Sequence, residues 1–425
     1  MISYILQKRR LLLLLALAVL ASVSLARVLL KDTGGRGLDF HAYWYSGHFL
    51  WQGMSPYPAL TDQNVLTLEG SQLTLPIRYW DGGIVEAGDV GQAGFPRVPG
   101  LTAPAVLVIS LLSRFSWPVA VPLWTGINCL LLLVIIWGCA KLLDRPVVSY
   151  ESIVLLLVAL SLIATRETLE LGQSTIFVLA GMLAGLAIAD RSQIGGGLLL
   201  GIALSKFTLI FPGLLIFLYK RHYRGAIATV AVQLLGTALL ALFAHSSFVE
   251  IVAAYFRLLS AHAGMEGMHL GQGLLHNHEW LQIVFVLLAV VLVGMGLTHL
   301  VRRRQTATPV SPASVTFILL VIGLLVGLLS FYHRRYDFMA GIPFLALIIL
   351  SGSQLGERFV LSRQQRAIVQ ATAALIAGVW ILPLYLLTSP TGYVYIYQLA
   401  VLAALGLSFW LLYRLRWQSL QKVGQ

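Results

Sequence analysis

Charged residues are scarce in this sequence: they make up only 11% of its 425 residues, whereas a soluble domain carries about a quarter. Hydrophobic residues, by contrast, make up 58%. Apolar runs of about 20 residues recur along the chain, and a helix of that length crosses a bilayer. The runs are continuous rather than alternating, which argues against a membrane β-barrel. The sequence therefore predicts an all-α polytopic membrane protein.

Cysteine is also scarce, because the chain has only Cys129 and Cys139 and both lie in one apolar run. This pair offers neither a disulfide framework nor a zinc-ligand spacing, so we expect buried free thiols. The sequence also lacks a P-loop motif, a coiled coil and a polar stretch long enough for a soluble domain. These absences argue against ATP and nucleotide sugars as direct substrates.

Basic residues outnumber acidic ones, with a formal net charge of +12. The cations gather in short segments between apolar runs: 8–10, 220–224, 302–304, 363–366 and 414–416. This is the pattern of cytoplasmic loops in membrane proteins, so we expect the lipid bilayer and no nucleic acid as a partner.

The apolar runs predict about 12 transmembrane helices in a single integral-membrane domain, 1–425. The first run is expected to be an uncleaved span. The clearest predicted spans are 11–30, 119–143, 150–165, 174–190, 226–245, 280–301, 313–332, 338–353, 368–388 and 395–414.

Residues 101–114 and 194–219 each allow two interpretations. Residues 101–114 are short for a span, so they either cross the bilayer or lie at its surface. Residues 194–219 carry Lys206 near their middle, so they form either one helix or a broken pair. With Met1 in the cytoplasm, a spanning 101–114 and a single helix at 194–219 would put three cations outside: Lys141, Arg145 and Arg191. The positive-inside rule favours the alternative, a surface segment and two short helices meeting at Lys206.

This topology leaves two large segments outside the cytoplasm, a first loop of about 31–100 and a second of about 246–279. The short connection 332–337, YHRRYD, is a third outer feature. Any chemistry is therefore expected outside the cytoplasm or in the outer leaflet. The predicted location is the bacterial inner (plasma) membrane, with the active site facing the exterior.

Asp39 is the lone acid of GLDFHAYWYSGHFLWQGMSPYP, residues 37–58, which follows the first apolar run. In a helical continuation, Asp39, Tyr43 and Gly47 would share a face. Desolvation among aromatic rings would make the carboxylate a candidate base. The alternative is an exposed loop carboxylate or helix cap among aromatics of the membrane interface.

Two further groups of ionisable residues could carry chemistry. His333, Arg334 and Arg335 offer donors for phosphate oxygens in a loop where cations are disfavoured. Lys206 stands alone in an apolar stretch, so it must snorkel, pair or bind an anion. Glu167, Glu170 and Gln173 are candidate partners or sugar ligands, although a structural ion pair is the alternative. HNHE at 276–279 lacks the spacing of a helical zinc motif, so we expect interfacial or substrate-contacting histidines there rather than a metal.

The layout resembles the GT-C superfamily of membrane glycosyltransferases, and more narrowly glycosyltransferase family 87. The matching pieces span about residues 10–350: LDFHAYWYSGHFLWQGMSPYP, LGQST at 171–175, GGLLLGIALSKFTLIFPGLLIFLYKRHYRG ending at Gly225, and SFYHRRYDF at 330–338. Relatives often have a Tyr-Pro-Pro-type element where this chain reads GFPRVPGLTAP, from Gly94 to Pro104. That departure puts the identity of the sugar in doubt.

The resemblance implies a GT-C-like fold and an inverting transfer of mannose, or of another hexose or pentose. The donor would be a polyprenyl-phosphate sugar and the acceptor an extracytoplasmic glycolipid or glycan. Asp39 would be the general base, and Lys206, His333, Arg334 and Arg335 would bind the donor phosphate. Sugar or acceptor contacts are assigned to His41, Tyr43, Glu167, Glu170, Gln173, Asp337 and His278. No cofactor is expected, with a divalent metal as the alternative.

Two other functions stay open at this point. A transporter or lipid flippase would also have many spans and charges within the membrane, although it usually shows internal repeats with paired broken helices. A non-catalytic partner in a membrane assembly would need neither Asp39 nor Arg334.

Overall fold

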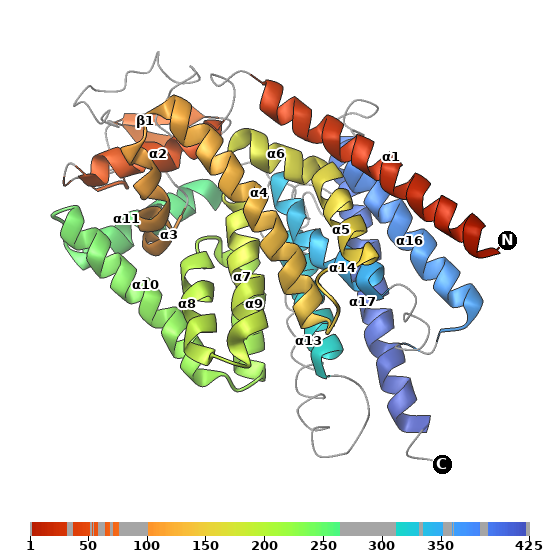
Figure 1. Ribbon diagram of the computed structural model, residues 1–425. Helices are drawn as coiled ribbons and strands as arrows, with labels where there is room; N and C mark the ends of the chain where they lie inside the picture. Colours follow the sequence, from red (N-terminus) through yellow and green to blue (C-terminus); the bar gives the residue numbers. More distant parts are fainter. Residues whose placement is uncertain are drawn as a thin grey trace.

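A computed structural model describes residues 2–31, 37–51, 53, 55–57, 64–68, 71–75, 101–263, 312–330, 335–351, 359, 361–382 and 390–421. Within these ranges four helices are long and apolar enough to cross a membrane: α1 (Ile2–Leu30), α4 (Trp117–Leu142), α10 (Tyr223–Phe243) and α17 (Pro390–Gln421). The bent pair α5 (Tyr150–Ser161) and α6 (Ile163–Leu171) would make a fifth span, with a 61° angle between its halves. These helices are inclined to one another, and in Figure 1 α1 slopes much less steeply than α17.

The predicted number of about 12 spans is not confirmed by these helices. The predicted span 280–301 lies outside the described residues. Other predicted spans form helices that are not identified as spans by themselves: α7 (Thr175–Ala189), α13 (Pro312–Ser330), α14 (Ile342–Ser351) and α16 (Arg363–Ile381). Burial among neighbouring helices explains why α7, α13 and α14 are strongly apolar, whereas α16 has a partly exposed, more polar sequence.

The two segments that allowed alternative interpretations both form short elements. Residues 101–114 become α3 (Ala103–Ser110) and the 3₁₀ helix η2 (Leu111–Arg114), and α3 is about 12 Å long, well short of a bilayer core. Residues 194–219 become α8 (Gln193–Ala203) and α9 (Phe207–Tyr219), which meet at Lys206. The predicted broken pair is therefore confirmed.

Helices α8 and α9 form a hairpin whose open ends lie together. Asp190, just before α8, accepts hydrogen bonds from Lys220 at 2.6 Å and from His222 at 2.9 Å, just after α9. Close packing of glycines holds α8 against α10, because a Cβ on Gly197 would lie 2.2 Å from the carbonyl oxygen of Gly225. The chain thus enters and leaves this hairpin at the same end of the helix bundle (Figure 1).

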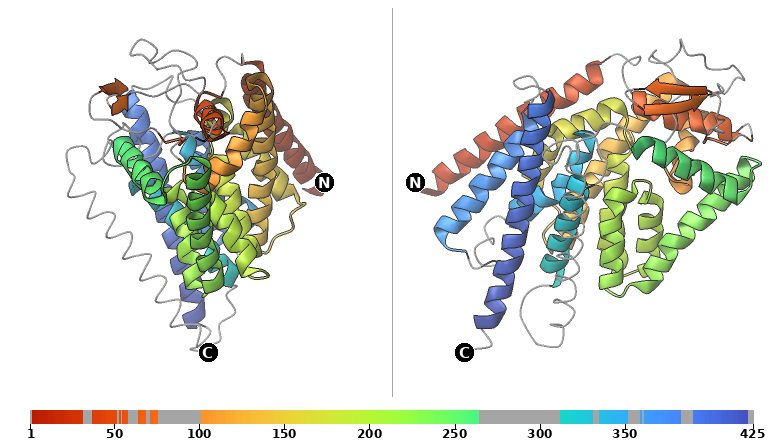
Figure 2. Two further views of the ribbon diagram at one scale, coloured as in Figure 1. Left: turned by 90° about the vertical axis from the view of Figure 1, so that its left-hand side faces the viewer. Right: turned by 180° about the vertical axis from the view of Figure 1, so that it is seen from behind.

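The predicted first outer loop, about 31–100, contains regular structure. It includes α2 (Leu38–Trp51) and an antiparallel pair of strands, β1 (Asn64–Leu68) and β2 (Ser71–Leu75), in which Asn64 pairs with Leu75. These are the two strands found among the described residues, whose other regular elements are helical. The second predicted outer loop, about 246–279, begins with α11 (Phe248–Ala263). Figure 2 shows α2, the strands and α11 gathered at one end of the bundle.

Two hydrophobic clusters of buried side chains organise the described residues. The larger one joins α4 to α7, α9, α13, α14, α16 and α17. The smaller one joins α2, α3 and α11 to the first part of α4 and the last part of α10. The candidate site lies where the elements of these two clusters meet.

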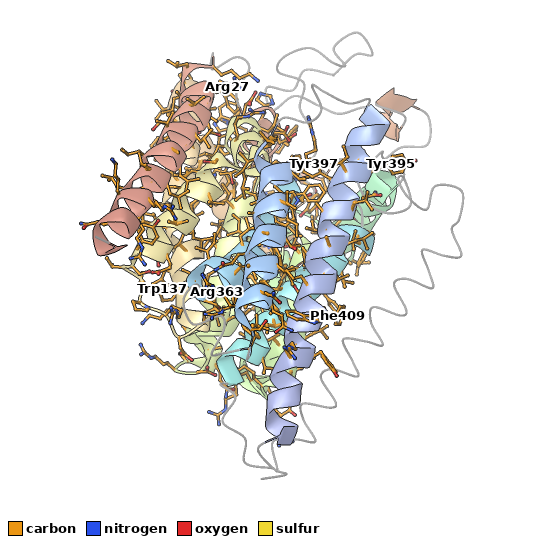
Figure 3. All side chains as sticks on the ribbon, turned by 90° about the vertical axis from the view of Figure 1, so that its right-hand side faces the viewer. Arg27, Trp137, Arg363, Tyr395, Tyr397 and Phe409 are labelled. Atoms are coloured by element: carbon orange, nitrogen blue, oxygen red, sulfur yellow. The ribbon has the colours of Figure 1, made fainter. Side chains whose placement is uncertain are left out.

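Cations gather at the opposite end of the bundle. Arg10 lies 5.1 Å from the ring centroid of Tyr150, and Arg145 Nε donates to the Leu350 carbonyl at 2.7 Å. Helices α16 and α17 are packed side by side, and Figure 3 places Arg363 far from Arg27 and Tyr397 along the bundle. The positive-inside rule would place this basic end in the cytoplasm, and the orientation of the chain stays a prediction.

Candidate active site

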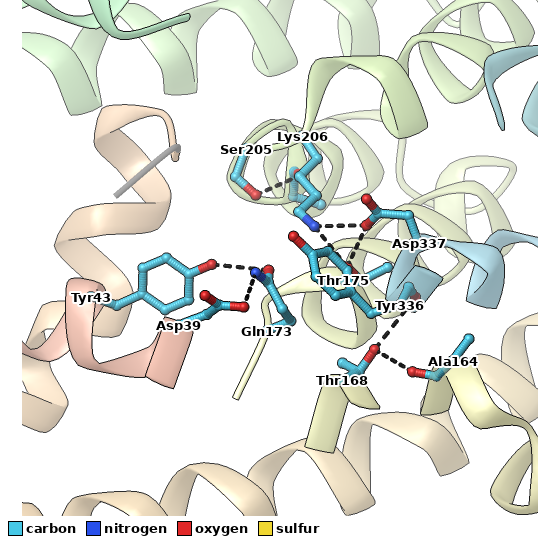
Figure 4. Close-up of polar contacts among 11 residues, drawn as sticks. Asp39, Tyr43, Ala164, Thr168, Gln173, Thr175, Ser205, Lys206, Tyr336 and Asp337 are labelled. Carbon is cyan, nitrogen blue, oxygen red and sulfur yellow. Dashed lines mark hydrogen bonds and ion pairs between the residues drawn. The ribbon is translucent and has the colours of Figure 1, made fainter. Parts of the chain in front are cut away.

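The short segment between α6 and α7, residues 171–175, brings several candidate residues together. Gly172 ends α6 in a left-handed conformation, with φ at +69°, which glycine adopts without steric strain. Its carbonyl oxygen accepts a hydrogen bond of 2.8 Å from the Trp124 indole. The turn presents Gln173 to α2 and Thr175 to the tip of the α8–α9 hairpin (Figure 4).

Helix α2 is held directly against this segment. The backbone N–H of Gly37 donates to the carbonyl of Glu170 at 2.8 Å. The buried Phe40 ring stacks on Trp124, with 5.4 Å between centroids. A Cβ on Gly172 would lie only 2.5 Å from the Cβ of Phe40. Glycine at position 172 therefore allows α2 to approach closely enough for Asp39 to reach Gln173.

Asp39 lies in the first turn of α2, where the helix dipole favours a negative charge. Gln173 Nε2 donates a hydrogen bond of 2.6 Å to Asp39 Oδ2. The Tyr43 hydroxyl donates to Gln173 Oε1 at 3.2 Å. The predicted common face of Asp39 and Tyr43 is thus confirmed, since both side chains reach Gln173 (Figure 4).

Tyr43 serves as a neutral donor in this arrangement. Burial raises the pKa of its phenol well above the usual value, and the charge of Asp39 raises it further, while hydrogen bonds with Ser174 act in the opposite direction. The protonated hydroxyl donates to Gln173 Oε1, which turns the amide nitrogen of Gln173 towards the carboxylate. Asp39 is consequently held as an acceptor with a fixed orientation.

A second polar cluster lies on the other side of Gln173. Lys206 Nζ donates to Asp337 Oδ1 at 2.7 Å and to Thr175 Oγ1 at 2.8 Å. The Thr175 hydroxyl donates to the same Asp337 oxygen at 2.7 Å. The ring centroid of Tyr336 is 4.7 Å from Lys206 Nζ, within the range of a cation–π contact. Asp337 and Tyr336 belong to the 3₁₀ helix η4 (Arg335–Gly341).

Two more ion pairs link α6 to neighbouring segments. Arg335 Nη2 lies 3.2 Å from Glu167 Oε1, and Lys31 pairs with Glu170. Glu167 and Glu170 are three positions apart on α6, so they share a face. Both acids were predicted as ion-pair partners or sugar ligands, and the structure shows the ion pairs.

The remaining predicted site residues are placed differently. The ring of His41 packs edge-on against Trp117, at 4.9 Å between centroids. His333, Arg334 and His278 lie outside the described residues. Their roles stay predictions, as does the absence of a metal. No cluster of three or more His, Cys, Asp or Glu side chains occurs within the described ranges.

Thr175 and Tyr336 had no predicted role, although both contact Lys206. Thr175 is the first residue of α7 and directly follows Gly172-Gln173-Ser174, so the LGQST motif was a signal for it. Tyr336 stands between two predicted site residues, Arg335 and Asp337. Its contact depends on the fold of η4, which the sequence pattern did not reveal.

Comparison with protein families matches residues 102–327, more than half of the chain, to the model of glycosyltransferase family 87. The chain belongs to glycosyltransferase family 87. No curated protein matches the sequence. Family 87 membership and the apolar helices together identify a membrane glycosyltransferase, which acts on a sugar donor and an acceptor.

The family 87 match covers only part of the candidate site. It includes Gln173, Thr175 and Lys206 on α6 to α9, whereas Asp39 and Asp337 lie beyond its two limits. The hydrogen bonds described above connect these outlying carboxylates to the matched region.

Proposed function

We propose that this family 87 enzyme moves a sugar from a polyprenyl-phosphate donor to a hydroxyl group of a glycolipid or glycan outside the cytoplasm. The observation that carries the proposal is that Asp39 and Lys206 both form hydrogen bonds with the segment 171–175. Asp39 accepts from Gln173, and Lys206 donates to Thr175. A carboxylate and a cation are needed at the two ends of such a transfer. One takes a proton from the acceptor, and the other compensates charge on the leaving phosphate.

In the proposed reaction, the acceptor oxygen forms a bond to the anomeric carbon of the sugar. The bond between that carbon and the phosphate oxygen breaks, and its electron pair leaves with the lipid phosphate. Asp39 takes the proton of the acceptor hydroxyl as general base. Attack from the face opposite the phosphate inverts the anomeric configuration.

The leaving phosphate is stabilised by cations rather than by an acid. Lys206 and Arg335 are the described candidates, and His333 and Arg334 belong to the same proposal. Sugar or acceptor contacts are proposed for His41, Tyr43, Glu167, Glu170, Gln173, Asp337 and His278. Of these, Tyr43 and Gln173 contact one another and Asp39, so they also orient the base.

The proposed donor and location follow from the setting of the site. The sequence has no P-loop motif, and the basic end of the bundle lies opposite α2, which favours a site on the outer side. A lipid-linked sugar is available there from the membrane itself. Mannose is the expected sugar, the bacterial plasma membrane the expected location, and no cofactor is part of the proposal.

Substitution of Asp39 by Asn tests the proposed base. We expect transfer from a polyprenyl-phosphate sugar to fall by a factor of about 10² to 10⁴, because the amide cannot accept the proton. Transfer is measured as labelled sugar moved to a glycolipid fraction by the purified enzyme in lipid nanodiscs.

Asp144→Asn is the matched control, since this exposed acid lies at the opposite end of the bundle, after α4. Its φ of +52° is one that Asn tolerates. The control should keep wild-type transfer and the same melting temperature. Wild-type turnover by Asp39→Asn would remove Asp39 from the role of base.

A further inference from the structure

The ion pair between Lys206 and Asp337 is the most enclosed pair of opposite charges among the described ion pairs. Only 17% of the Lys206 side chain and 8% of the Asp337 side chain are exposed. The partners come from distant parts of the chain: Lys206 precedes α9 at the tip of the hairpin, and Asp337 belongs to η4. Enclosing both charges is costly, which points to a role for the pair beyond packing.

The surroundings of Asp337 Oδ1 are those of an anion-binding site. This one oxygen accepts hydrogen bonds from both the Lys206 ammonium and the Thr175 hydroxyl, each at 2.7 Å. Thr175 begins α7 and Lys206 immediately precedes α9, so the positive ends of two helix dipoles add to the local potential. A phosphate oxygen would make the same contacts as the carboxylate oxygen that occupies this position.

We propose that Asp337 is a displaceable internal counter-ion, which holds Lys206 in the resting enzyme and gives way to the phosphate of the lipid donor. This inference rests on the proposed function, because it takes a polyprenyl phosphate as the incoming anion. The exchange makes and breaks no covalent bond: Lys206 and Thr175 release the carboxylate and bind a phosphate oxygen.

The exchange also assists release of the lipid product. The donor is a phosphodiester with one negative charge, whereas the product is a phosphomonoester with a charge of about −1.5 to −2 at neutral pH. The product would therefore bind Lys206 more tightly than the donor does. A carboxylate that competes for the same ammonium weakens this product binding and returns the site to its resting state.

The fold around Asp337 is suited to such movement. Asp337 lies in a 3₁₀ helix, whose hydrogen bonds have poorer geometry than those of an α-helix. The adjacent carbonyl of Tyr336 is held by a long hydrogen bond of 3.4 Å from Thr168. The Tyr336 ring remains available to Lys206 through its cation–π contact.

The direct test measures binding of a polyprenyl phosphate to the purified full-length protein in nanodiscs. Asp337→Asn should bind it about tenfold more tightly than wild type, and Lys206→Met about tenfold more weakly. In the Lys206→Met background, adding Asp337→Asn should change the affinity less than it does in wild type, since Asp337 no longer competes with the phosphate for the Lys206 ammonium.

Asp190→Asn is the matched control, because it removes the acid from another Asp–Lys pair, with Lys220, at the basic end. It should leave the affinity unchanged, and a polyprenol without phosphate should bind all variants alike. An affinity that is unchanged or weaker in Asp337→Asn, or equally raised for the polyprenol, would overturn the proposal and indicate a structural ion pair.

Wild-type protein provides a second test in case Asp337→Asn fails to fold. On adding polyprenyl phosphate, backbone amides of 335–341 should exchange hydrogen faster, while those of 203–209 should exchange more slowly. Slower exchange in both segments, or no change in 335–341, would contradict displacement. Both tests measure binding without sugar transfer, so the result for Asp39→Asn does not affect them.

Discussion

Gln173 links the candidate base to the rest of the protein. It is buried, it donates to Asp39, and it accepts from Tyr43. A carboxylate on an isolated turn would sample several orientations, whereas the amide of Gln173 leaves Asp39 one preferred orientation. Gln173 is therefore a positioning residue for the proposed base.

Gln173→Leu should lower kcat about tenfold or more, because the orientation of Asp39 is lost. The KM for the donor should change little, because Lys206 and Thr175, on the other side of Gln173, remain available to the donor phosphate. Steady-state transfer assays over a range of donor concentrations would measure both effects.

Gln233→Leu is the comparison for this change, because the side-chain amide of Gln233 donates to the carbonyl oxygen of Gly201 on α8 rather than to Asp39. It should leave kcat unchanged even if it lowers the melting temperature. A kcat of Gln173→Leu equal to that of wild type would show that Gln173 does not position the base.

At the scale of elements, the site depends on how closely α2 approaches the turn between α6 and α7. Gly37 and Gly172 both have positive φ values, and a Cβ on Gly172 would lie 3.3 Å from the Cα of Gly37. Side chains at these positions would separate the two segments. Asp39 would then move away from Gln173 even though no catalytic residue had been substituted.

Gly172→Ala should therefore reduce both stability and transfer. An Ala in the left-handed conformation costs about 1–2 kcal/mol, and the clash with Phe40 adds about 1–3 kcal/mol. We expect a lower melting temperature in nanodiscs. We also expect kcat to change by a larger factor than the KM for the donor.

Gly378→Ala in α16 provides the contrast, because a Cβ there meets nothing within 4 Å. Alanine is the better residue in a helix, so this variant should be as stable as wild type or slightly more so. A Gly172→Ala protein with unchanged stability and kcat would show that the close approach is unimportant.

Several residues that the sequence singled out lie together in the structure, whereas the predicted number of spans is not confirmed. Asp39, Tyr43 and Gln173 were each proposed, and a break at Lys206 was favoured because it keeps Lys141, Arg145 and Arg191 in the cytoplasm. The partner of Lys206 could not be derived, since Asp337 is far away in sequence and only the fold of η4 brings it near.

Hydropathy also could not separate a spanning helix from a short helix buried by its neighbours. Helix α7 and the α8–α9 hairpin are as apolar as a span, because protein rather than lipid surrounds much of their surface. The β1–β2 strands lie in a polar segment without a long apolar run, so nothing in the hydropathy marked them.

At the scale of the whole molecule, the α8–α9 hairpin determines which end of each later helix faces the cytoplasm. If the hairpin returns to its own side, Arg191 before α8 and Arg224 after α9 lie on the same side of the membrane. If α8 and α9 crossed together as one span, these residues would lie on opposite sides. The ion pair of Asp190 with Lys220 supports the first arrangement.

Cysteine labelling in intact cells distinguishes the two arrangements. In a background with Cys129 and Cys139 replaced by Ala, Arg191→Cys and Arg224→Cys should react with a membrane-impermeant maleimide only after permeabilisation. Glu250→Cys, an exposed position in the first turn of α11 beyond α10, should react without permeabilisation. Reaction of Arg191→Cys but not Arg224→Cys in intact cells would show a continuous span and would place Lys206 within it. The same result would remove the physical basis for bringing Lys206 to the end of the bundle that carries Asp39.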